Sequence, residues 1–181
     1  IFFLLIVCSL AVQAWVLRSW AVDDAAISFA YARNLWLGNG LIAQVNASPV
    51  EGFSNPLWVL ILSPVTWLSD VVLSTKLLAL TFVATAAYRI SSVARKATNS
   101  VFGWVAGLLL VLQPSVTIWA QSGLENSLTL LLGVELLVRL MRLSIGDPSG
   151  RTAVEAGLIC AALALTRPEG IVFSALFPLV A

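Results

Sequence analysis

The strongest constraint on the fold of this chain is a succession of apolar runs, each close to the length that crosses a lipid bilayer. A membrane-spanning helix needs about 20 apolar residues, because the hydrocarbon core is about 30 Å thick. Hydrophobic residues make up 60% of the 181 residues, and only 10% are charged. We therefore predict an all-α, polytopic membrane protein with spans at residues 1–17, 71–90, 101–120, 124–141 and 152–165, and another beginning at residue 171.

The charge balance and the rare residue types exclude several functional classes. The net charge is only +1, and Lys and Arg are scattered at the ends of the apolar runs, so nucleic acid is not a predicted partner. The chain has no histidine, which excludes histidine-based catalysis and histidine-ligated metal within this stretch. Cys8 and Cys160 lie within apolar runs without metal-ligand spacing, and we expect both to be small buried hydrophobes.

The chain begins at Ile1 rather than at a methionine and ends within an apolar run. We interpret it as a fragment that forms a single transmembrane module over residues 1–181. The run at residues 1–17 exceeds the apolar core of a signal peptide, and no cleavage-like pattern follows it, which favours a first span. Residues 71–181 hold the remaining predicted spans.

A long outer loop is predicted between the first and second spans. The apolar stretch from Pro56 to Ser69 offers about twelve helical residues, or about 18 Å, which is too short to cross the membrane. Residues 18–70 are therefore predicted to stay on one side and to carry juxtamembrane helices. Trp58 and Trp67 are the expected interfacial anchors.

The basic residues orient these spans, because positively charged loops stay on the cytoplasmic side. Two basic clusters would lie there if residues 56–69 do not cross, namely Arg89, Arg95 and Lys96, and then Arg139, Arg142 and Arg151. The outer face would then collect Asp23, Asp24, Glu51, Glu125, Arg167 and Glu169. Since the chain has nine acidic residues, five of them at one surface indicate a functional site.

The outer loop opens with adjacent carboxylates and an amphipathic helix. Apolar residues recur at three- and four-residue spacing over residues 24–37, which predicts a helix lying flat on the membrane, and Gly38-Asn39-Gly40 predicts its end. Asp23 or Asp24 would fit an N-cap or a first-turn acid that the helix dipole favours. A carboxylate in this place would also serve as a general base, and the two roles are compatible.

Two further turns bring charged side chains to the outer face. Glu125 follows the break of the third predicted span near Pro114, and it would either cap the fourth helix or hold substrate or a cation. Residues 166–170 would form either a turn with a local ion pair, worth about 0–1 kcal/mol if exposed, or a grip on a lipid-linked phosphate through Arg167.

Glu135 lies near the middle of the fourth predicted span, where an unpaired carboxylate costs about 2.5–3.5 kcal/mol. We therefore expect it to face protein or to pair with Arg139, four residues later. An isolated intramembrane acid also fits a transporter, but no pair of Gly- or Pro-broken spans repeats in inverted order.

The motifs DDAAISFAYARNL, GNGL, VEGFSNPLW, QSGLENSL and LALTRPEG follow one another over most of residues 21–170. In their order and spacing, the chain resembles the polyprenyl-phosphate-sugar-dependent glycosyltransferases of the GT-C superfamily. It is similar to the terminal arabinofuranosyltransferases of the mycobacterial cell envelope and their bacterial relatives. The resemblance implies a multi-pass protein of the bacterial inner (plasma) membrane, with its active site on the extracytoplasmic face.

The resemblance also implies an activity and roles for individual residues. A sugar would pass, with inversion, from a polyprenyl-phosphate-linked donor to a hydroxyl of an envelope glycan, lipid or protein. Asp24 or Asp23 would take the acceptor proton, and Arg167 would stabilise the departing phosphate. The other predicted substrate-binding residues are Glu51, Glu125, Glu169, Tyr31 and Asn55. No cofactor is predicted, because the outer-face acids, although suited in type to a divalent cation, show no coordination spacing.

Two other functional classes stay open from the sequence. A non-enzymatic carrier of lipid-linked sugars or small solutes would place its functional charges at mid-membrane depth, whereas here the acids collect at one rim. A structural partner subunit would make Asp24, Glu125 and Arg167 individually dispensable.

Overall fold

The computed structural model describes residues 2–46, 50–144 and 150–176, and within these ranges the chain is helical and has no strand. The predicted all-α class is confirmed. The helices are α1 (Phe2–Val16), α2 (Ala25–Trp36), α3 (Pro56–Val65), α4 (Val71–Thr98), α5 (Trp104–Val111), α6 (Pro114–Ala120), α7 (Asn126–Ser144), α8 (Gly150–Thr166) and α9 (Ile171–Leu176), with single turns η1 (Val101–Gly103) and η2 (Pro168–Gly170). Ile1 and the parts of the predicted outer loop, inner loop and last span at residues 47–49, 145–149 and 177–181 lie outside the described residues.

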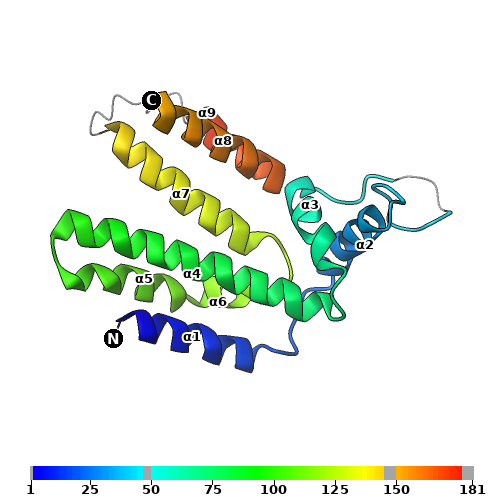
Figure 1. Ribbon diagram of the computed structural model, residues 1–181, viewed down its shortest axis with the longest axis horizontal. Coiled ribbons are helices and arrows are strands. Elements are labelled where there is room, and N and C mark those ends of the chain that lie inside the picture. Colours follow the sequence, from blue (N-terminus) through cyan, green and yellow to red (C-terminus); the bar gives the residue numbers. More distant parts are fainter. Residues whose placement is uncertain (1, 47–49, 145–149, 177–181) are drawn as a thin grey trace.

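The long helices form a bundle, and α2 and α3 gather at one end of it (Figure 1). In the bundle, α4 packs against both α5 and α7, α1 packs against α5 and α4, and α8 packs against α7. We call the end that carries α2 and α3 the cap end; α1 and α8 end there, and α4 and α7 begin there. The opposite end, where α4 and α7 finish, is the far end. The residues that the sequence predicts on the outer face thus lie at the cap end.

The longest helix, α4, has 28 residues and begins and ends at clear sequence signals. The Asp70 carboxylate accepts a hydrogen bond from the Leu73 amide at 2.9 Å, which caps the first turn. Asn99 adopts the left-handed conformation that ends the helix, with φ of 47°. The helix therefore continues beyond the span predicted at residues 71–90, because no Gly or Pro lies between Val71 and Asn99.

Two glycines allow the chain to return closely along α4. A Cβ atom at Gly107 would lie 2.2 Å from the Ser91 Oγ, and the Gly107 amide donates a hydrogen bond to that oxygen at 3.1 Å. A Cβ atom at Gly103 would lie 2.3 Å from the backbone nitrogen of Arg95. The returning segment is broken as predicted near Pro114, where α5 and α6 meet at 61°.

The helix predicted over residues 24–37 is confirmed as α2, which Asp24 and Leu37 flank. It packs on α3, and the shared core contains Tyr31, Ala32, Trp58, Val59, Leu62 and Leu128. The interfacial role predicted for Trp58 is wrong, because its ring is fully buried in this core and its Nε1 donates to the Gly123 carbonyl at 3.2 Å. Trp67 is 76% exposed, as an anchor would be. Cys160 is buried as expected, whereas Cys8 is exposed and its expected burial is wrong.

The described helices support fewer membrane spans than the sequence predicts. Among the described residues, only α4 is long and apolar enough to cross a bilayer as one helix. The number of candidate spans rises to two if the bent pair of α5 and α6 counts as one span. Both α1 and α3 are apolar but shorter, and α8 has 17 residues. Three charged residues interrupt α7, namely Glu135, Arg139 and Arg142. A set of five uniform spans is therefore not supported by helix length and composition.

The mid-helix carboxylate of Glu135 is paired on two sides, as its burial requires. Its Oε1 lies 2.5 Å from the Arg89 Nε of α4, and its other oxygen contacts Arg139 one turn away. The Arg139 Nε in turn lies 3.4 Å from a Glu155 oxygen on α8. The expectation that Glu135 faces protein and pairs with Arg139 is confirmed. These contacts tie α4, α7 and α8 together between the two ends of the bundle.

Glu135→Ala is expected to lower the free energy of unfolding by about 3 kcal/mol. Two arginines would lose their shared carboxylate, and removing one partner of a buried pair costs about 3–5 kcal/mol; the lower end applies because the Glu135 side chain is 16% exposed. Thermal unfolding of the full-length protein in detergent measures the change. Glu51→Ala removes the same charge from the exposed loop and should change stability by at most about 0.5 kcal/mol. Equal unfolding midpoints for the two variants would contradict a stabilising role for Glu135.

Candidate functional site

A cavity of about 600 Å³ lies at the cap end, where four separate parts of the chain meet. These parts are the start of α2, the segment that leads into α3, the turn between α6 and α7, and the turn after α8. We call it the polar cavity, and it is lined by Asp24, Ile27, Ser28, Gly52, Phe53, Ser54, Asn55, Trp119, Leu124, Glu125, Asn126 and Arg167. It brings together Asp24, Asn55, Glu125 and Arg167, which the sequence predicts as site residues from four distant motifs.

The Glu125 carboxylate is the central acceptor on the wall of the polar cavity. It is 6% exposed, and its Oε2 accepts a hydrogen bond from the Asn55 Nδ2 at 2.8 Å. The same Asn55 amide donates to the Ser28 Oγ at 3.1 Å. The Glu125 Oε1 lies 3.3 Å from the Arg167 Nη1. Because both carboxylate oxygens are engaged by protein groups, Glu125 is suited to holding its partners in place rather than to accepting a proton from a ligand.

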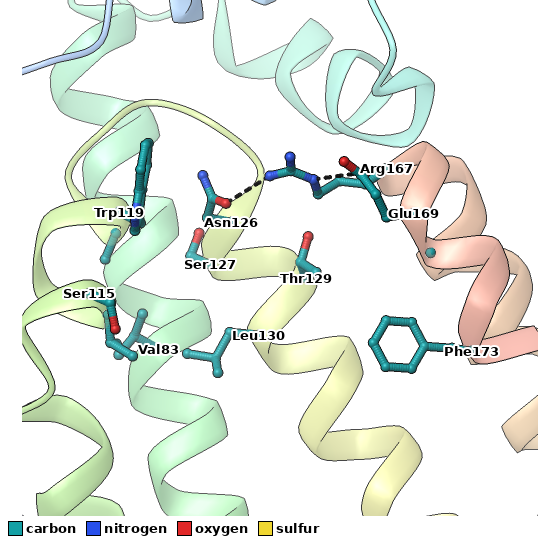
Figure 2. Close-up of a pocket in the computed structure, with 13 residues that line it drawn as sticks. Val83, Ser115, Trp119, Asn126, Ser127, Thr129, Leu130, Arg167, Glu169 and Phe173 are labelled. Carbon is teal, nitrogen blue, oxygen red and sulfur yellow. Dashed lines mark hydrogen bonds and ion pairs between the residues drawn. The ribbon is translucent and has the colours of Figure 1, made fainter. Parts of the chain in front are cut away.

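Arg167 joins the turn after α8 to the start of α7. Its Nη1 donates to the Asn126 Oδ1 at 3.0 Å, and its Nε donates to a Glu169 oxygen at 3.3 Å, as Figure 2 shows. Its Nη2 makes none of the hydrogen bonds seen among the described residues, and the side chain is 37% exposed. Arg167 is therefore held by three side chains and keeps one nitrogen for a ligand.

Glu169 lies on the exposed side of this arginine. A hydrogen bond from its own backbone amide, together with the hydrogen bond and charge of Arg167, lowers the pKa of Glu169 from its usual value. The carboxylate is therefore ionised at neutral pH and partly offsets the positive charge of Arg167. Glu169, predicted to bind substrate, contacts Arg167 but does not line the polar cavity.

The two predicted catalytic aspartates differ in position. Asp24 lines the polar cavity, and its side chain makes no capping hydrogen bond although it occupies the N-cap of α2. Both aspartates are exposed, but Asp23, one residue earlier, is not part of the cavity wall. Asp24 thus does not form the capping hydrogen bond that an N-cap acid could make. Its structural role is limited to a favourable interaction with the α2 dipole.

The approach of Asp24 to the cavity depends on the turn between α6 and α7. Gly123 has φ of +87°, and a Cβ atom there would lie 2.9 Å from the Ala25 Cβ. The Val22 amide donates to the Ser122 carbonyl at 3.0 Å, directly before Asp23 and Asp24. Glycine at position 123 therefore allows the positive φ of the turn and leaves room for the close contact with the start of α2.

Tyr31 and Glu51, also predicted to bind substrate, lie outside the polar cavity. Tyr31 is buried beneath the loop, where its hydroxyl donates to the Val50 carbonyl and accepts a hydrogen bond from the Gly52 amide at 3.0 Å. Its ring packs on Phe53 with 4.6 Å between centroids. Glu51 is exposed, although its neighbours Gly52 and Phe53 line the cavity. Tyr31 thus shapes the cavity wall by holding this segment against α2.

The sequence reading missed Lys76, which holds the segment before the aspartates. Lys76 is 4% exposed, and its Nζ donates to the carbonyls of Leu17, Arg18 and Trp20 at 3.0, 2.9 and 2.6 Å. These carbonyls follow the end of α1, where a cation is favoured. The sequence did offer one sign of this role. Lys76 is a single lysine in the second turn of an apolar helix, and because a cation is disfavoured near a helix N-terminus, its side chain is expected to have a specific partner.

Lys76→Met is expected to loosen the segment that leads to Asp24. Three carbonyls would lose a charged donor, and hydrogen bonds to charged groups contribute about 1.5–3 kcal/mol. Hydrogen exchange of the full-length protein should show faster exchange at residues 17–22. Lys96→Met is the matched control, because Lys96 is exposed on the same helix. Unchanged exchange at residues 17–22 in Lys76→Met would show that the lysine does not hold this segment.

A second cavity, of about 510 Å³, adjoins the polar cavity (Figure 2), and apolar atoms form most of its wall surface. We call it the apolar groove, and it is lined by Val83, Ser115, Val116, Trp119, Ala120, Asn126, Ser127, Thr129, Leu130, Arg167, Glu169, Gly170 and Phe173. It shares Trp119, Asn126 and Arg167 with the polar cavity. In Figure 2, Arg167 spans one end of the groove, while Leu130 and Phe173 lie further along it. The buried Ser127 hydroxyl, on its wall, has no hydrogen-bond partner among the described residues.

The two cavities meet at Trp119, Asn126 and Arg167, so the Arg167 guanidinium, paired with Glu125 and Glu169, lies between a polar side and a mainly apolar side. Within the described ranges, no three Asp, Glu, Cys or His side chains gather in a way that would hold a metal ion. Ser28, Trp119 and Asn126 are wall residues that the sequence analysis did not single out. Comparisons with protein-family models, with curated proteins and with solved structures find no match to this chain.

Proposed function

We propose that this chain is the membrane module of an inverting glycosyltransferase that uses a polyprenyl-phosphate-linked sugar. One observation carries the proposal: Arg167 lies where the polar cavity, which contains Asp24, meets the apolar groove. A lipid-linked sugar has the same order of parts, with an apolar tail, an anionic phosphate and a polar sugar. Arginine suits the middle position because its planar fork binds phosphate oxygens.

We further propose a multi-pass arrangement in the bacterial plasma membrane, with the cap end on the extracytoplasmic side. The basic residues Arg95, Lys96 and Arg142 lie in the last turns of α4 and α7, at the far end, as cytoplasmic ends require. The apolar side chains exposed on α1, α4 and α5 would face lipid. The charged groups of α7 would be tolerated because Glu135 is paired with Arg89 and Arg139 within the bundle.

In the proposed reaction, the Asp24 carboxylate accepts the proton of an acceptor hydroxyl. The hydroxyl oxygen forms a bond to the anomeric carbon as the bond from that carbon to the phosphate oxygen breaks, and the configuration inverts. The bonding electron pair leaves with the phosphate, which gains negative charge beside Arg167. The acceptor is a hydroxyl of an envelope glycan, lipid or protein, and the second product is the polyprenyl phosphate.

The other predicted site residues would act as positioning residues in this scheme. Glu125 holds Arg167 on one side and Asn55 on the other, and Glu169 holds the Arg167 Nε. Tyr31 fixes the segment from Val50 to Gly52 that shapes the cavity wall. Asp23 and Glu51 lie outside the cavity and have no direct part in the step.

The placement of the lipid can be tested by photocrosslinking. The full-length protein in membranes would be irradiated with a polyprenyl phosphate that carries a photoreactive group in its chain. Crosslinks are expected at groove residues such as Val116, Leu130 and Phe173, and excess unlabelled polyprenyl phosphate should suppress them. Leu130→Trp should reduce them by filling the groove, whereas Leu137→Trp, on an exposed face of the same helix, should not. Crosslinks spread evenly over the exposed apolar surface would contradict binding in the groove.

A further inference from the structure

A third cavity, of about 400 Å³, lies between α4 and α7 near the far end of the bundle. It is separate from the two cavities at the cap end and shares no lining residue with them. Its cations are Arg89, Lys96 and Arg142, and none of its lining residues is acidic. We call it the basic cavity.

The cations of the basic cavity are only partly neutralised by the part of the chain that the structure describes. Arg89 uses its Nε and Nη2 on Glu135, and this carboxylate also contacts Arg139. Lys96 and Arg142 are exposed and take part in none of the ion pairs among the described residues. The cavity therefore carries a net positive charge that suits an anionic ligand.

The remaining walls show what kind of anion fits. Val93, Val138 and Met141 form an apolar side beside the cations, and Met141 is exposed. A small free anion would leave this apolar side uncovered. A phospholipid with an anionic headgroup would place its phosphate among the cations and its acyl chains along the apolar side. Basic pockets between membrane helices on the cytoplasmic side bind such headgroups.

We infer that the basic cavity binds an anionic phospholipid of the inner leaflet. This inference rests on the membrane orientation given under the proposed function, but it does not depend on the transfer reaction. Arg89 places the bound phosphate next to the network of Glu135 and Arg139, so that the lipid would bridge the far ends of α4 and α7.

The test measures lipid retained by the full-length protein after extraction from nanodiscs of phosphatidylcholine with phosphatidylglycerol. Wild type should retain phosphatidylglycerol in preference to phosphatidylcholine. The double variant Lys96→Gln/Arg142→Gln should bind it about 30-fold more weakly, which is the effect of removing two cations near a membrane surface. Glycerol phosphate added in excess should not displace the lipid, because it lacks the acyl chains.

A matched double variant, Arg95→Gln/Arg151→Gln, separates a specific site from general surface charge. It also removes two cations, but Arg95 lies over the Trp104 ring and Arg151 pairs with Glu155, and neither lines the basic cavity. It should retain phosphatidylglycerol as wild type does. Equal losses in the two double variants, or no lipid preference in wild type, would overturn the inference. Thermal unfolding of each variant checks that it is folded. Sugar transfer is assayed separately in phosphatidylcholine alone, so that failure of the lipid site can be distinguished from failure of the proposed reaction.

Discussion

Asp24→Asn is expected to lower the rate of sugar transfer by about 10²–10⁴-fold, the contribution of a positioned general base. Asparagine keeps the shape of the side chain but cannot accept the acceptor proton. Asp24 is the aspartate that lines the polar cavity, and its side chain is not used to cap α2. Transfer from a radiolabelled polyprenyl-phosphate sugar by the full-length protein in membranes measures the change, with protein abundance determined in parallel.

Asp23→Asn is the matched control for this prediction, because it makes the same chemical change one residue away. Asp23 lies outside the cavity wall, so transfer should stay close to that of wild type. Loss of transfer in Asp23→Asn with full transfer in Asp24→Asn would show that the base is the other aspartate. Full transfer in both variants would leave the pair with the structural role of acids at a helix N-terminus.

Arg167→Gln is expected to lower the turnover number by about 10²–10³-fold, as loss of a preorganised group at a site of developing charge does. The substitution removes the cation beside the departing phosphate and also the contacts to Glu125, Asn126 and Glu169. Arg167→Lys should recover part of the rate, because it restores the charge without the planar fork. Transfer at saturating donor, compared with the Michaelis constant for donor, separates the effect on the chemical step from weaker binding.

Arg151→Gln controls for the loss of one positive charge. Arg151 is exposed at the start of α8 and pairs with Glu155, away from both cap-end cavities. Its variant should transfer sugar at the wild-type rate. An Arg167→Gln protein with normal abundance and an unchanged turnover number would contradict the role of Arg167 at the phosphate.

Much of the fold could be predicted because the chain carries strong local signals. The helix at residues 24–37 followed from apolar periodicity and from the glycines after it, and the break near Pro114 followed from the missing amide of proline. Helix lengths were predicted less well. The predicted span at residues 71–90 followed the length of the apolar run, whereas α4 continues to Thr98; the sequence pattern also could not show that Trp58 turns into the core between α2 and α3.

Because successive helices alternate in direction, the sequence could predict that the site residues lie at one end of the bundle. It could not predict which of these residues contact one another. Asp23 and Asp24 are adjacent, and only the direction in which α2 begins decides which of them reaches the cavity. The contact of Asn55 with Glu125 joins residues 70 positions apart, and the isolated Lys76 gives no sign in the sequence of which backbone carbonyls it binds. Such contacts depend on tertiary packing rather than on local sequence.

The most direct test of the proposed enzyme is sugar transfer by the full-length wild-type protein, supplied with a panel of radiolabelled polyprenyl-phosphate sugars and membrane acceptors. We predict transfer from at least one donor, dependent on the protein, with a product whose anomeric configuration is opposite to that of the donor. Absence of transfer from every donor, together with movement of lipid-linked sugar across proteoliposomes that contain the protein, would contradict an enzyme and indicate a carrier.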